Sequence, residues 1–351
     1  MPTFNAKQLQ ILTASIFHSL GAPRADAELV AKLLVEANLT GFDSHGVIRL
    51  PIYARGIKQG AVKPGAEITL VKETASTAII DGGWNFGQVV AQQAMNLCIE
   101  KAKNNVIGLV LVRRCHHVGR LNMYAEMAMQ QNMIGIVSVN STSSVAPYGG
   151  KTRQLGTNPL CFAIPAGKEP PMTLDMATSV WARGKVMVYL ARGNTLPEGV
   201  LFDDQGGPTT DPTWYIRGGM LQPLGGLVGY KGFGLALLVE ILAGALTEAG
   251  CSNSDEYRSR PFYGGNGVFC MAINVNELTD LTLFKNRVDA LFHSIKASPT
   301  ASSFSEILLP GDPERRTKAQ RLVDGIYIED KTWNEIKTLA QELQVAIPKA
   351  S

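Results

Sequence analysis

The sequence predicts an α/β protein with a mixed sheet, and three observations lead to this prediction. Its 351 residues are 45% hydrophobic and 18% charged, which is typical of an ordinary globular protein. Patterns with helical spacing alternate with short apolar runs of the kind found in buried strands. The chain is also too long for one hydrophobic core, so we expect two or three packed lobes.

The first 75 residues are predicted to be mainly helical. Asn5 and Gln8 have the spacing of a capping box, and the helix that follows them ends before Gly21. A second amphipathic helix runs to Gly41. Residues 51–75 then predict a short helix, a Pro/Gly turn and an edge strand.

A regular alternation of strands and helices follows. A strand is expected over residues 77–83 and a helix over 88–103. The continuous apolar run "VIGLVLVRR" predicts a strand that is buried on both faces. A helix over 121–131 and the strand "MIGIVSVNS" repeat the alternation, which is the pattern of a layered α/β fold.

Residues 141–230 have a different character. They are rich in Gly, Pro, Thr and Ser, and long ordered loops of this kind are unusual unless they line a site. The apolar window from Gly234 predicts a buried helix, because it is shorter than the ~20 apolar residues of a membrane span. A strand over 267–275, a helix over 279–296 and two terminal helices complete the chain.

Charge and cysteine usage exclude several classes of function. The net charge of +3 comes without a block of Lys and Arg, so nucleic acid is not an expected partner. The five cysteines are scattered and form no disulfide or CxxC pattern, and the N-terminus lacks a secretory signal. We therefore expect a cytoplasmic protein with no membrane partner.

The usual nucleotide-binding sequences are missing from the chain. Neither G-x-G-x-x-G nor a P-loop occurs, which disfavours an ordinary Rossmann domain. "GYKGFG" at residues 229–234 instead places glycines and Lys231 at the start of an apolar helix, and a helix N-terminus attracts anions such as a diphosphate. Close helix packing through small residues explains the same glycines, and this segment alone leaves both explanations open.

A pair of adjacent histidines is the next candidate. His116 and His117 follow Cys115, a grouping that suggests a metal-dependent hydrolase. Adjacent side chains on an extended strand point to opposite faces, so we expect no shared metal. His117 lies at the end of a predicted parallel strand, where α/β sheets hold ligands. A ligand-binding residue and a hydrogen-bonded structural histidine both suit that position.

The densest polar group is "GFDSHGVIRLPIYARG" at residues 41–56, directly after the second helix. Asp43, Ser44 and His45 are contiguous, whereas the members of a hydrolase triad come from separate segments, and no G-x-S-x-G is present. Ser44 or Asp43 could orient His45 for proton transfer, and Arg49 offers a fork for a carboxylate. A solvated loop at the end of a helix is the alternative.

Seven motifs, spread over nearly the whole chain, resemble the malate/L-lactate dehydrogenase family of the non-Rossmann type. They are "GFDSHGVIRLPIYARG", "HHVGR", "APYGG" with "LGTNPLCFAIP", "LDMATSVWARGK", "LPEGVLFDDQGGPTTDP", "GYKGFGLALLVEILAGAL" and "LPGDPE". Other members of this family are ureidoglycolate, sulfolactate, 2,3-diketogulonate and cyclic-imine 2-carboxylate oxidoreductases.

The resemblance implies a family-specific NAD(P)-binding fold and a cytoplasmic homodimer. It implies a helical substrate and dimerisation lobe over residues 1–115, completed by 276–351, and a dinucleotide-binding domain over 116–275. The implied reaction is hydride transfer between nicotinamide and C2 of a small malate-like or lactate-like 2-oxo or 2-hydroxy acid. The alternatives are a cyclic-imine 2-carboxylate reductase of the piperideine or pyrroline type and a catalytically silent dinucleotide-binding dimer.

The resemblance also implies roles for single residues. His45 is similar to the family's proton donor, Ser44 to the group that orients it, and Arg49 to the clamp for the substrate carboxylate. Thr157 resembles a substrate contact, and His117 matches a position at the nicotinamide that is the catalytic base in some members. The positions similar to cofactor contacts are His117, Val118, Gly119, Arg120, Ser141, Asp175, Met176, Ala177, Lys231, Gly311, Asp312 and Pro313. No metal is implied.

Two departures from the family pattern bear on the ligands. Tyr230 stands where many relatives have a histidine before Lys231, which changes the expected contacts of the diphosphate. Arg183 and Lys185 follow the "LDMA" element, where some imine reductases have an acidic residue. This difference favours an oxo acid over an imine as substrate.

The choice of cofactor depends on the last motif. Arg315 and Arg316 follow the "PGDP" turn and offer positive charge to the 2′-phosphate of NADP. Asp312 lies beside them, and an acidic group near the adenosine ribose is typical of NAD sites. We therefore expect NAD, with NADP as the alternative.

Overall fold

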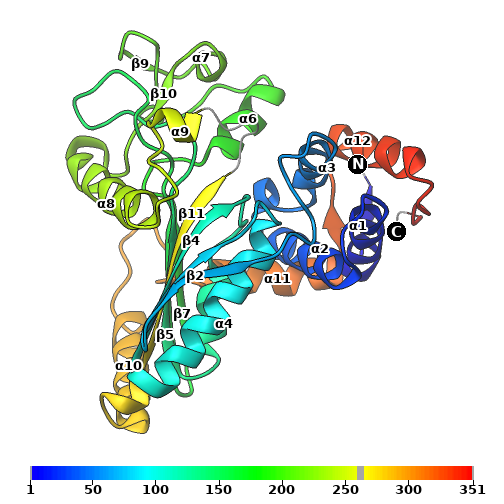
Figure 1. Cartoon of the computed structure of the whole chain (residues 1–351). Helices are drawn as coiled ribbons and strands as arrows, with labels where there is room; N and C mark the ends of the chain where they lie inside the picture. The colour runs from blue at the N-terminus through cyan, green and yellow to red at the C-terminus, as the bar shows by residue number, and fades with distance from the viewer. Residues whose placement is uncertain (1, 259–264, 350–351) are drawn as a thin grey trace.

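The computed structural model describes residues 2–258 and 265–349, and its centre is a seven-stranded sheet (Figure 1). In spatial order the strands are β2 (Thr69–Glu73), β3 (Thr77–Asp81), β4 (Ile107–Cys115), β11 (Asn266–Asn274), β5 (Met133–Val139), β6 (Leu160–Ile164) and β7 (Met172–Met176). Strands β3 and β4 are parallel, and the other neighbouring pairs are antiparallel. The predicted mixed α/β sheet is confirmed.

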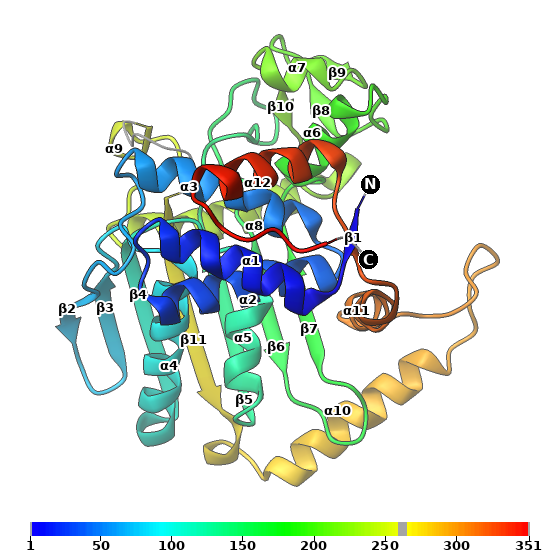
Figure 2. The same cartoon turned by 90° about the vertical axis from the view of Figure 1, so that its right-hand side faces the viewer.

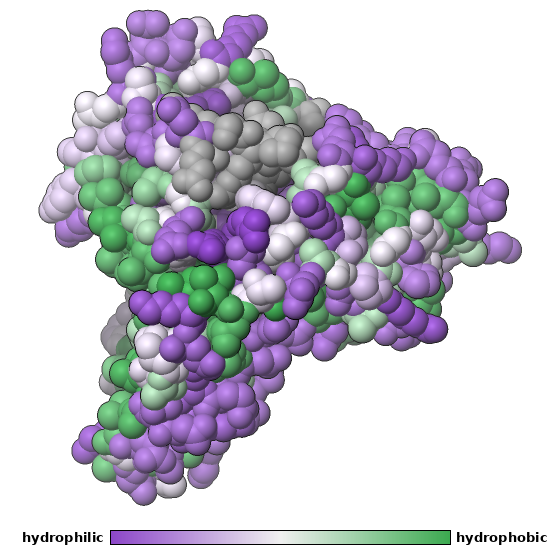
Figure 3. Space-filling model, in the orientation of Figure 1, coloured by the Kyte–Doolittle hydropathy of each residue, from purple (hydrophilic) through white to green (hydrophobic). Residues whose placement is uncertain are grey.

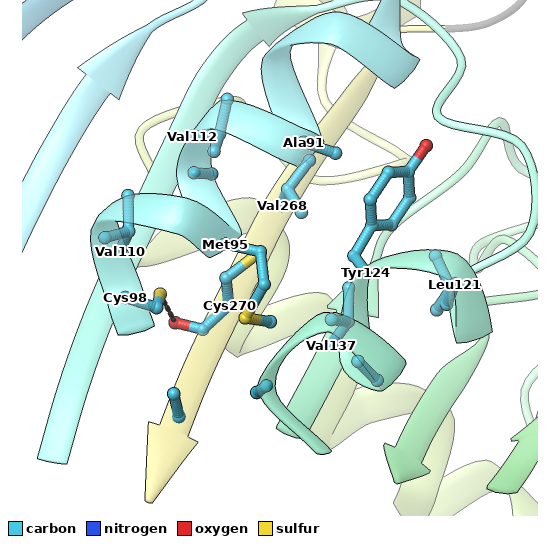
Figure 4. Packing of buried hydrophobic residues seen from close by; sticks show 14 of the residues in the cluster. Ala91, Met95, Cys98, Val110, Val112, Leu121, Tyr124, Val137, Val268 and Cys270 are labelled. Carbon is cyan, nitrogen blue, oxygen red and sulfur yellow. Dashed lines mark hydrogen bonds between the residues drawn. The ribbon is translucent and has the colours of Figure 1, made fainter. Parts of the chain in front are cut away.

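Two helices cover one face of this sheet. Helices α4 (Gly87–Asn105) and α5 (Asn122–Met129) lie side by side in front of the strands (Figure 2). Met95 of α4 packs with Val110 and Val137 of two strands, and all three are fully buried (Figure 4). Because each such side chain contributes roughly 1.5–3 kcal/mol on burial, this layer is a major source of stability.

The opposite face of the sheet is covered only in part. Helix α8 (Tyr230–Glu240) and the π-helical turn Ile241–Ala245 that continues it lie on this side. Val239 is buried against the sheet, but Leu238 and Ile241 are 51% and 52% exposed. The prediction of a buried helix is therefore wrong for this chain by itself. Figure 3 shows the hydrophobic surface over α8 at the left of the view.

Helix α8 is exposed because only one of its faces packs against the rest of the chain. Small and medium side chains form its inward face, and within the described residues nothing covers its outward leucines and isoleucine. Nor does the described part of the chain contain a helix long and apolar enough to cross a bilayer.

Strand β4 is also more open than its apolar run predicts. Val110 and Val112, which face α4, are fully buried. On the other face, Leu109 is half-buried and Ile107 is 40% exposed. The expectation of complete burial on both faces is wrong, because α8 covers its side of the sheet incompletely.

A helical lobe joins the two ends of the chain (Figure 1). Its helices are α1 (Ala6–Ser19), α2 (Arg24–Leu39), α3 (Leu50–Lys58) and α12 (Asp330–Glu342). The predicted capping box is confirmed, since Asn5 Oδ1 accepts Gln8 N at 2.9 Å and Gln8 Oε1 accepts Asn5 N at 3.2 Å. Strand β1 (Thr3–Phe4) pairs with β12 (Ile326–Tyr327), so C-terminal residues complete this lobe.

Residues 178–228 build most of a small loop-rich lobe above the sheet, as their composition predicts (Figure 1). Its elements, with the neighbouring α9, are α6 (Arg183–Ala191), β8 (Leu201–Phe202), β9 (Pro208–Thr209), α7 (Thr213–Ile216), β10 (Met220–Leu221) and α9 (Asp255–Arg258). Val145, Val186 and Leu201 belong to a separate small core in this lobe.

Helix α10 (Leu281–Lys296) runs past the lower end of the sheet, and the chain then returns to α11 (Asp312–Asp324) beside the helical lobe (Figure 2). Helix α10 begins at Leu281, two residues later than predicted, because Asp280 caps it by accepting Leu283 N at 2.7 Å. Leu283 and Leu291 on this helix are exposed.

The seven-stranded sheet spans the expected domain boundary after residue 115. Strands β3 and β4 precede that point, whereas β5 and β11 follow it and pair in the same sheet. The sheet therefore contains strands from both sides of this boundary. The polar segments at its end face both the helical and the loop-rich lobe.

Candidate active site

A cavity of about 550 Å³ lies where the helical lobe, the carboxyl end of β4 and the loop-rich lobe meet. Its volume is within the range of small-molecule sites. The predicted site residues that line it are Ser44, His45, Arg49, His117, Gly119, Arg120, Ser141, Thr157, Asp175, Met176 and Ala177. The fold thus brings together residues from widely separated motifs.

Two short 3-10 turns, Asp43–His45 and Val47–Arg49, carry polar residues from the end of α2 into this cavity. Asn38 holds the two turns in place, because its Oδ1 accepts Val47 N at 2.9 Å. A Cβ on Gly46 would lie 2.2 Å from Asn38 Oδ1. Only glycine allows this close approach, so the turn geometry depends on it.

Asp43 and Ser44 make different contacts in the first turn. The Asp43 carboxylate pairs with Arg321 of α11 at 2.7 Å, which ties the turn to that helix. Ser44 Oγ lies 3.0 Å from His45 Nδ1. Of the two candidates for orienting His45, Ser44 is therefore the one in contact with it.

Three histidines line the cavity together with Tyr53. The rings of His45 and His117 stack with centroids 5.7 Å apart and an interplanar angle of 21°. His116 and His117 both contact the Tyr53 ring and both line the cavity. The expectation that they point to opposite faces of a strand is wrong, because β4 ends at Cys115 and both histidines lie beyond it. In the described part of the chain, no group of three His, Cys, Asp or Glu side chains could hold a metal ion.

Burial and the Arg49 charge lower the pKa of the cavity histidines. The pKa of His45 falls to about 3 and that of His116 to about 4, while the pKa of His117 falls well below its usual range. Burial is the largest cause of each shift, and all three imidazoles are therefore neutral at pH 7. An anion bound to Arg49 would raise these pKa values.

Arg49 is a partly buried cation at the cavity wall. Its Nε donates to Ser44 O at 2.6 Å, and no carboxylate among the described residues pairs with it. Burial lowers the pKa of the guanidinium, and the charge of Arg183 in the same cavity lowers it further. A desolvated charge is costly when it has no partner, so Arg49 strongly favours an incoming carboxylate.

The histidine shifts predict that the folded chain is sensitive to acid. Between about pH 6.5 and pH 4, the unfolded chain binds protons at His45 and His116 that the folded chain does not. The free energy of unfolding should therefore fall as the pH falls through this window. Urea denaturation at several pH values and a fixed protein concentration measures the slope of this free energy against pH. We expect His45→Asn to flatten it and the double variant with His116→Asn to flatten it more; unchanged slopes would contradict the shifts.

Asp175 and Arg120 form a buried pair at the cavity wall. The Asp175 carboxylate lies 3.4 Å from Arg120 Nε and accepts Asn122 N at 3.1 Å. Burial raises the pKa of the Asp175 carboxyl in spite of the Arg120 charge. Arg120 also donates to Thr40 Oγ1 at 2.7 Å and lies over the Phe42 ring. The pair therefore joins β7, the segment after β4 and the end of α2.

Ser141 and Thr157 are fixed by a buried network around Glu240 of α8. Ser141 Oγ accepts Thr157 N at 3.0 Å, and Asn158 Oδ1 accepts Ser141 N at 3.2 Å. Asn158 Nδ2 donates to Glu240 Oε2 at 2.7 Å, and Ser252 N donates to Glu240 Oε1 at 2.6 Å. Glu240, which in the sequence only interrupts an apolar helix, thus positions two cavity residues.

The remaining lining fits a nicotinamide dinucleotide. Such a ligand needs hydroxyl, carboxylate and backbone partners for its ribose and phosphate groups. The cavity offers the hydroxyl-bearing residues 141–144, the Asp175 carboxylate and the backbone around Gly119, whose φ is 80°. These groups are suited to hold the ribose and phosphates, and the histidines lie in the same cavity.

Several predicted cofactor contacts do not line this cavity. They are Val118, Lys231, Gly311, Asp312 and Pro313. Lys231 is exposed, with Nζ 6.0 Å from the centre of the Tyr230 ring. Asp312 accepts Leu309 N at 2.9 Å at the start of α11 and pairs with Arg315 at 2.6 Å. The roles of these residues in cofactor binding stay predictions.

Tyr53, which lines the cavity, and Gln88, which contacts Tyr53 from α4, are site residues that the sequence analysis missed. Tyr53 Oη lies 2.6 Å from His117 Nδ1, and Gln88 Nε2 donates to Tyr53 Oη at 2.9 Å. Tyr53 follows Arg49 by four residues, and this helical spacing could have placed the two on one side. No local pattern points to Gln88, which lies 35 residues from Tyr53 in the chain.

Comparison with known proteins identifies the family. The sequence profile of the malate/L-lactate dehydrogenase family matches residues 4–337. The chain belongs to this family. One relative in this malate/L-lactate dehydrogenase family is the L-sulfolactate dehydrogenase of Methanocaldococcus jannaschii, which is 40% identical over 349 residues, or 98% of this chain and 97% of the relative.

Solved structures in this family have the same fold. The malate dehydrogenase of Entamoeba histolytica matches with a TM-score of 0.94 and 31% identity, covering 99% of both chains. The Δ1-piperideine-2-carboxylate reductase of Pseudomonas syringae pathovar tomato matches with a TM-score of 0.86 and 28% identity, covering 97% of this chain and 100% of that one. The resemblance read from the sequence is confirmed, and the imine reductase is the less similar of these two structures.

Proposed function

We propose that this family member transfers a hydride between a nicotinamide dinucleotide and C2 of a small 2-oxo or 2-hydroxy acid. One observation carries the proposal: the Arg49 guanidinium, which pairs with no carboxylate of the described residues, lies in the same cavity as the stacked rings of His45 and His117. A 2-oxo acid has a carboxylate that suits Arg49 and, on the adjacent carbon, an oxygen that suits the two imidazoles. Oxidation of NADH by such an acid tests the proposal directly.

The residues of the chain divide the work of the reaction. Arg49 binds the substrate carboxylate through a charge-assisted fork. A bound nicotinamide supplies the hydride in reduction and accepts it in oxidation. His45, oriented by Ser44, gives a proton to the C2 oxygen as negative charge develops there, and it removes that proton in the reverse direction. The substrate carboxylate offsets the Arg49 charge, which raises the His45 pKa toward the range where proton transfer is efficient.

NAD is the proposed cofactor in preference to NADP. The two arginines that could meet a 2′-phosphate already pair with acids: Arg315 lies 2.6 Å from Asp312, and Arg316 lies 2.6 Å from Glu306. A 2′-phosphate would have to compete with these carboxylates. Assays with both cofactors in parallel decide between them.

Arg183 supports a substrate with a second acidic group. It is the first residue of α6, lines the cavity and acts electrostatically on Arg49. The adjacent Gly184 packs so closely that a Cβ there would lie 2.5 Å from Ser44 Cβ. Two neighbouring cations favour a dianion such as oxaloacetate or a sulfo-oxo acid over pyruvate. They disfavour a protonated cyclic imine, so the imine reductase is the weaker alternative.

Substitution of Arg183 tests this preference. Arg183→Gln is expected to raise KM for oxaloacetate about tenfold or more, a loss of ~1.4 kcal/mol, and to change KM for pyruvate little. The ratio of kcat/KM for the two acids is the measurement. Arg192→Gln removes the same charge at the other end of α6 and is the matched control. An equal loss with both acids would contradict a role for Arg183 at the second acidic group.

We also propose that the chain forms a homodimer through the apolar outer face of α8. Leu238 and Ile241 on this face are about half exposed, and it adjoins the partly covered side of the sheet, where Met271 is only partly buried. A contiguous exposed apolar surface is typical of a protein interface. A second copy on this face would also hold the helix whose Glu240 positions the cavity.

A charge on this face should disrupt the dimer. Leu238→Glu is expected to give monomers in sedimentation equilibrium, because an interface cannot easily bury an unpaired carboxylate. Ile11→Glu places the same charge on the exposed side of α1 and should leave the dimer intact. A monomeric unsubstituted protein would contradict the proposal.

The proposed location is the cytoplasm. All five cysteines are free thiols, and four of them are buried. Free thiols are typical of proteins from reducing compartments. The partners proposed are a small acid, the dinucleotide and a second copy of the chain, without nucleic acid or membrane.

A further inference from the structure

Two hydrogen bonds connect Gln88, Tyr53 and His117 in series. Gln88 Nε2 of α4 donates to Tyr53 Oη of α3 at 2.9 Å, and Tyr53 Oη lies 2.6 Å from His117 Nδ1. Tyr53 and Gln88 are each only 1% exposed. Tyr53 lines the cavity, and Gln88 supports it from α4. These two hydrogen bonds therefore connect a cavity histidine to a group in the protein core.

The chemistry of these three groups determines where their protons lie. The amide nitrogen of Gln88 can only donate, so the Tyr53 oxygen accepts its hydrogen. The single Tyr53 proton is then directed to His117 Nδ1, which accepts it with its lone pair. A neutral imidazole whose Nδ1 accepts a hydrogen bond carries its own proton on Nε2.

Two further observations support this direction. In the orientation found, the only Gln88 atom without a hydrogen-bond partner among the described residues is the carbonyl oxygen Oε1. The reversed amide would bury N–H donors without partners, which is rarer and more costly than an unpaired carbonyl. Tyr53 also keeps its proton, because burial raises its pKa to about 12.

His45 and His117 differ in their freedom to exchange protons. Burial, and after it the Arg49 charge and the imidazoles of His45 and His116, lower the pKa of His117 and keep it neutral. If His117 carried a proton on Nδ1, that proton would point at the Tyr53 hydroxyl proton, and the hydrogen bond between the two groups would be lost. Among the described residues, His45 Nδ1 is hydrogen-bonded only to the Ser44 hydroxyl, and a hydroxyl can either donate or accept.

We propose that Tyr53 and Gln88 are positioning residues that hold His117 as the neutral tautomer with its proton on Nε2. His117 is then a fixed hydrogen-bond donor for an oxygen of the bound substrate or cofactor, and proton transfer belongs to His45. A neutral donor polarises such an oxygen without losing a proton to it. The link to catalysis rests on the proposed function, whereas the tautomer itself does not.

Nitrogen NMR on protein labelled in its histidine rings reads the tautomer directly. The chain has five histidines, and His117→Asn identifies the His117 signals by their loss. We expect the Nε2–H pattern for His117 at neutral pH. Gln88→Glu replaces the donor by a carboxylate that accepts a hydrogen bond from the Tyr53 hydroxyl. Tyr53 Oη then faces His117 Nδ1 as an acceptor, so the His117 signals should change to the Nδ1–H form or to imidazolium. Gln93→Glu, on the exposed side of α4, adds the same charge and should leave them unchanged.

An Nδ1–H tautomer in the unsubstituted protein would overturn the proposal, and so would an unchanged pattern in folded Gln88→Glu. If Gln88→Glu does not fold, Tyr53→Phe provides a second test. Loss of the phenol proton should then give a mixture of both tautomers, and a pure Nε2–H signal would again overturn the proposal. Because the readout needs no turnover, the expected tautomer without hydride transfer would refute the proposed function alone.

Discussion

Replacing His45 with alanine is expected to lower kcat for oxo-acid reduction at least ~100-fold and to change NADH affinity little. General acid catalysis by a positioned side chain contributes roughly 100-fold to 10,000-fold. His45 is the candidate acid because Ser44 Oγ orients it at 3.0 Å and Arg49, the carboxylate site, is close enough to shift its pKa. Steady-state kinetics at saturating NADH measures the loss.

A histidine away from the cavity provides the control for this experiment. His293→Ala changes an exposed residue of α10 and should leave kcat unchanged. If His45→Ala retained nearly full kcat, His45 would not be the proton donor. Retained NADH binding without turnover in the unsubstituted protein would favour the silent dinucleotide-binding dimer.

Replacing Arg49 with alanine should act mainly on substrate binding. The substrate carboxylate loses its fork, and truncation of one partner of a buried charge pair costs about 2–5 kcal/mol, so KM should rise at least ~30-fold. Arg49→Lys keeps the charge but loses the planar fork, and we expect an intermediate KM. Initial rates over a wide range of acid concentration give KM, and calorimetry gives cofactor affinity, which should not change.

Arg55→Ala is the matched control, because Arg55 is an exposed arginine on the neighbouring helix α3. It should leave KM close to that of the unsubstituted protein. A normal KM in Arg49→Ala would remove this residue from the carboxylate clamp.

Local patterns predict much of this fold, because the spacing of apolar residues determines helices and strands. The capping box at Asn5 lies where the sequence places it, and β4 at Ile107–Cys115 lies one residue later than the run "VIGLVLVRR" predicts. The exposure of α8 could not be predicted, since an apolar helix has the same pattern whether it packs in its own chain or against another. The insertion of β11 between β4 and β5 depends on a contact between distant segments.

The site also has a part that the sequence predicts and a part that it does not. Ser44, His45 and Arg49 are predictable as a group because two consecutive turns carry them. The hydrogen bonds from Gln88 through Tyr53 to His117 join residues far apart in the sequence, so no single stretch indicates them. Glu240 likewise acts through partners that only the folded chain brings to it.

Absorbance of the reduced nicotinamide gives the most direct test of hydride transfer. Purified protein would be given NADH and NADPH in parallel, with pyruvate, oxaloacetate, 2-oxoglutarate, a sulfo-oxo acid and a cyclic imine carboxylate as substrates. We expect NADH to be oxidised fastest with oxaloacetate or the sulfo-oxo acid. Absence of oxidation with every oxo acid, while NADH still binds, would contradict the roles proposed for Arg49 and His45.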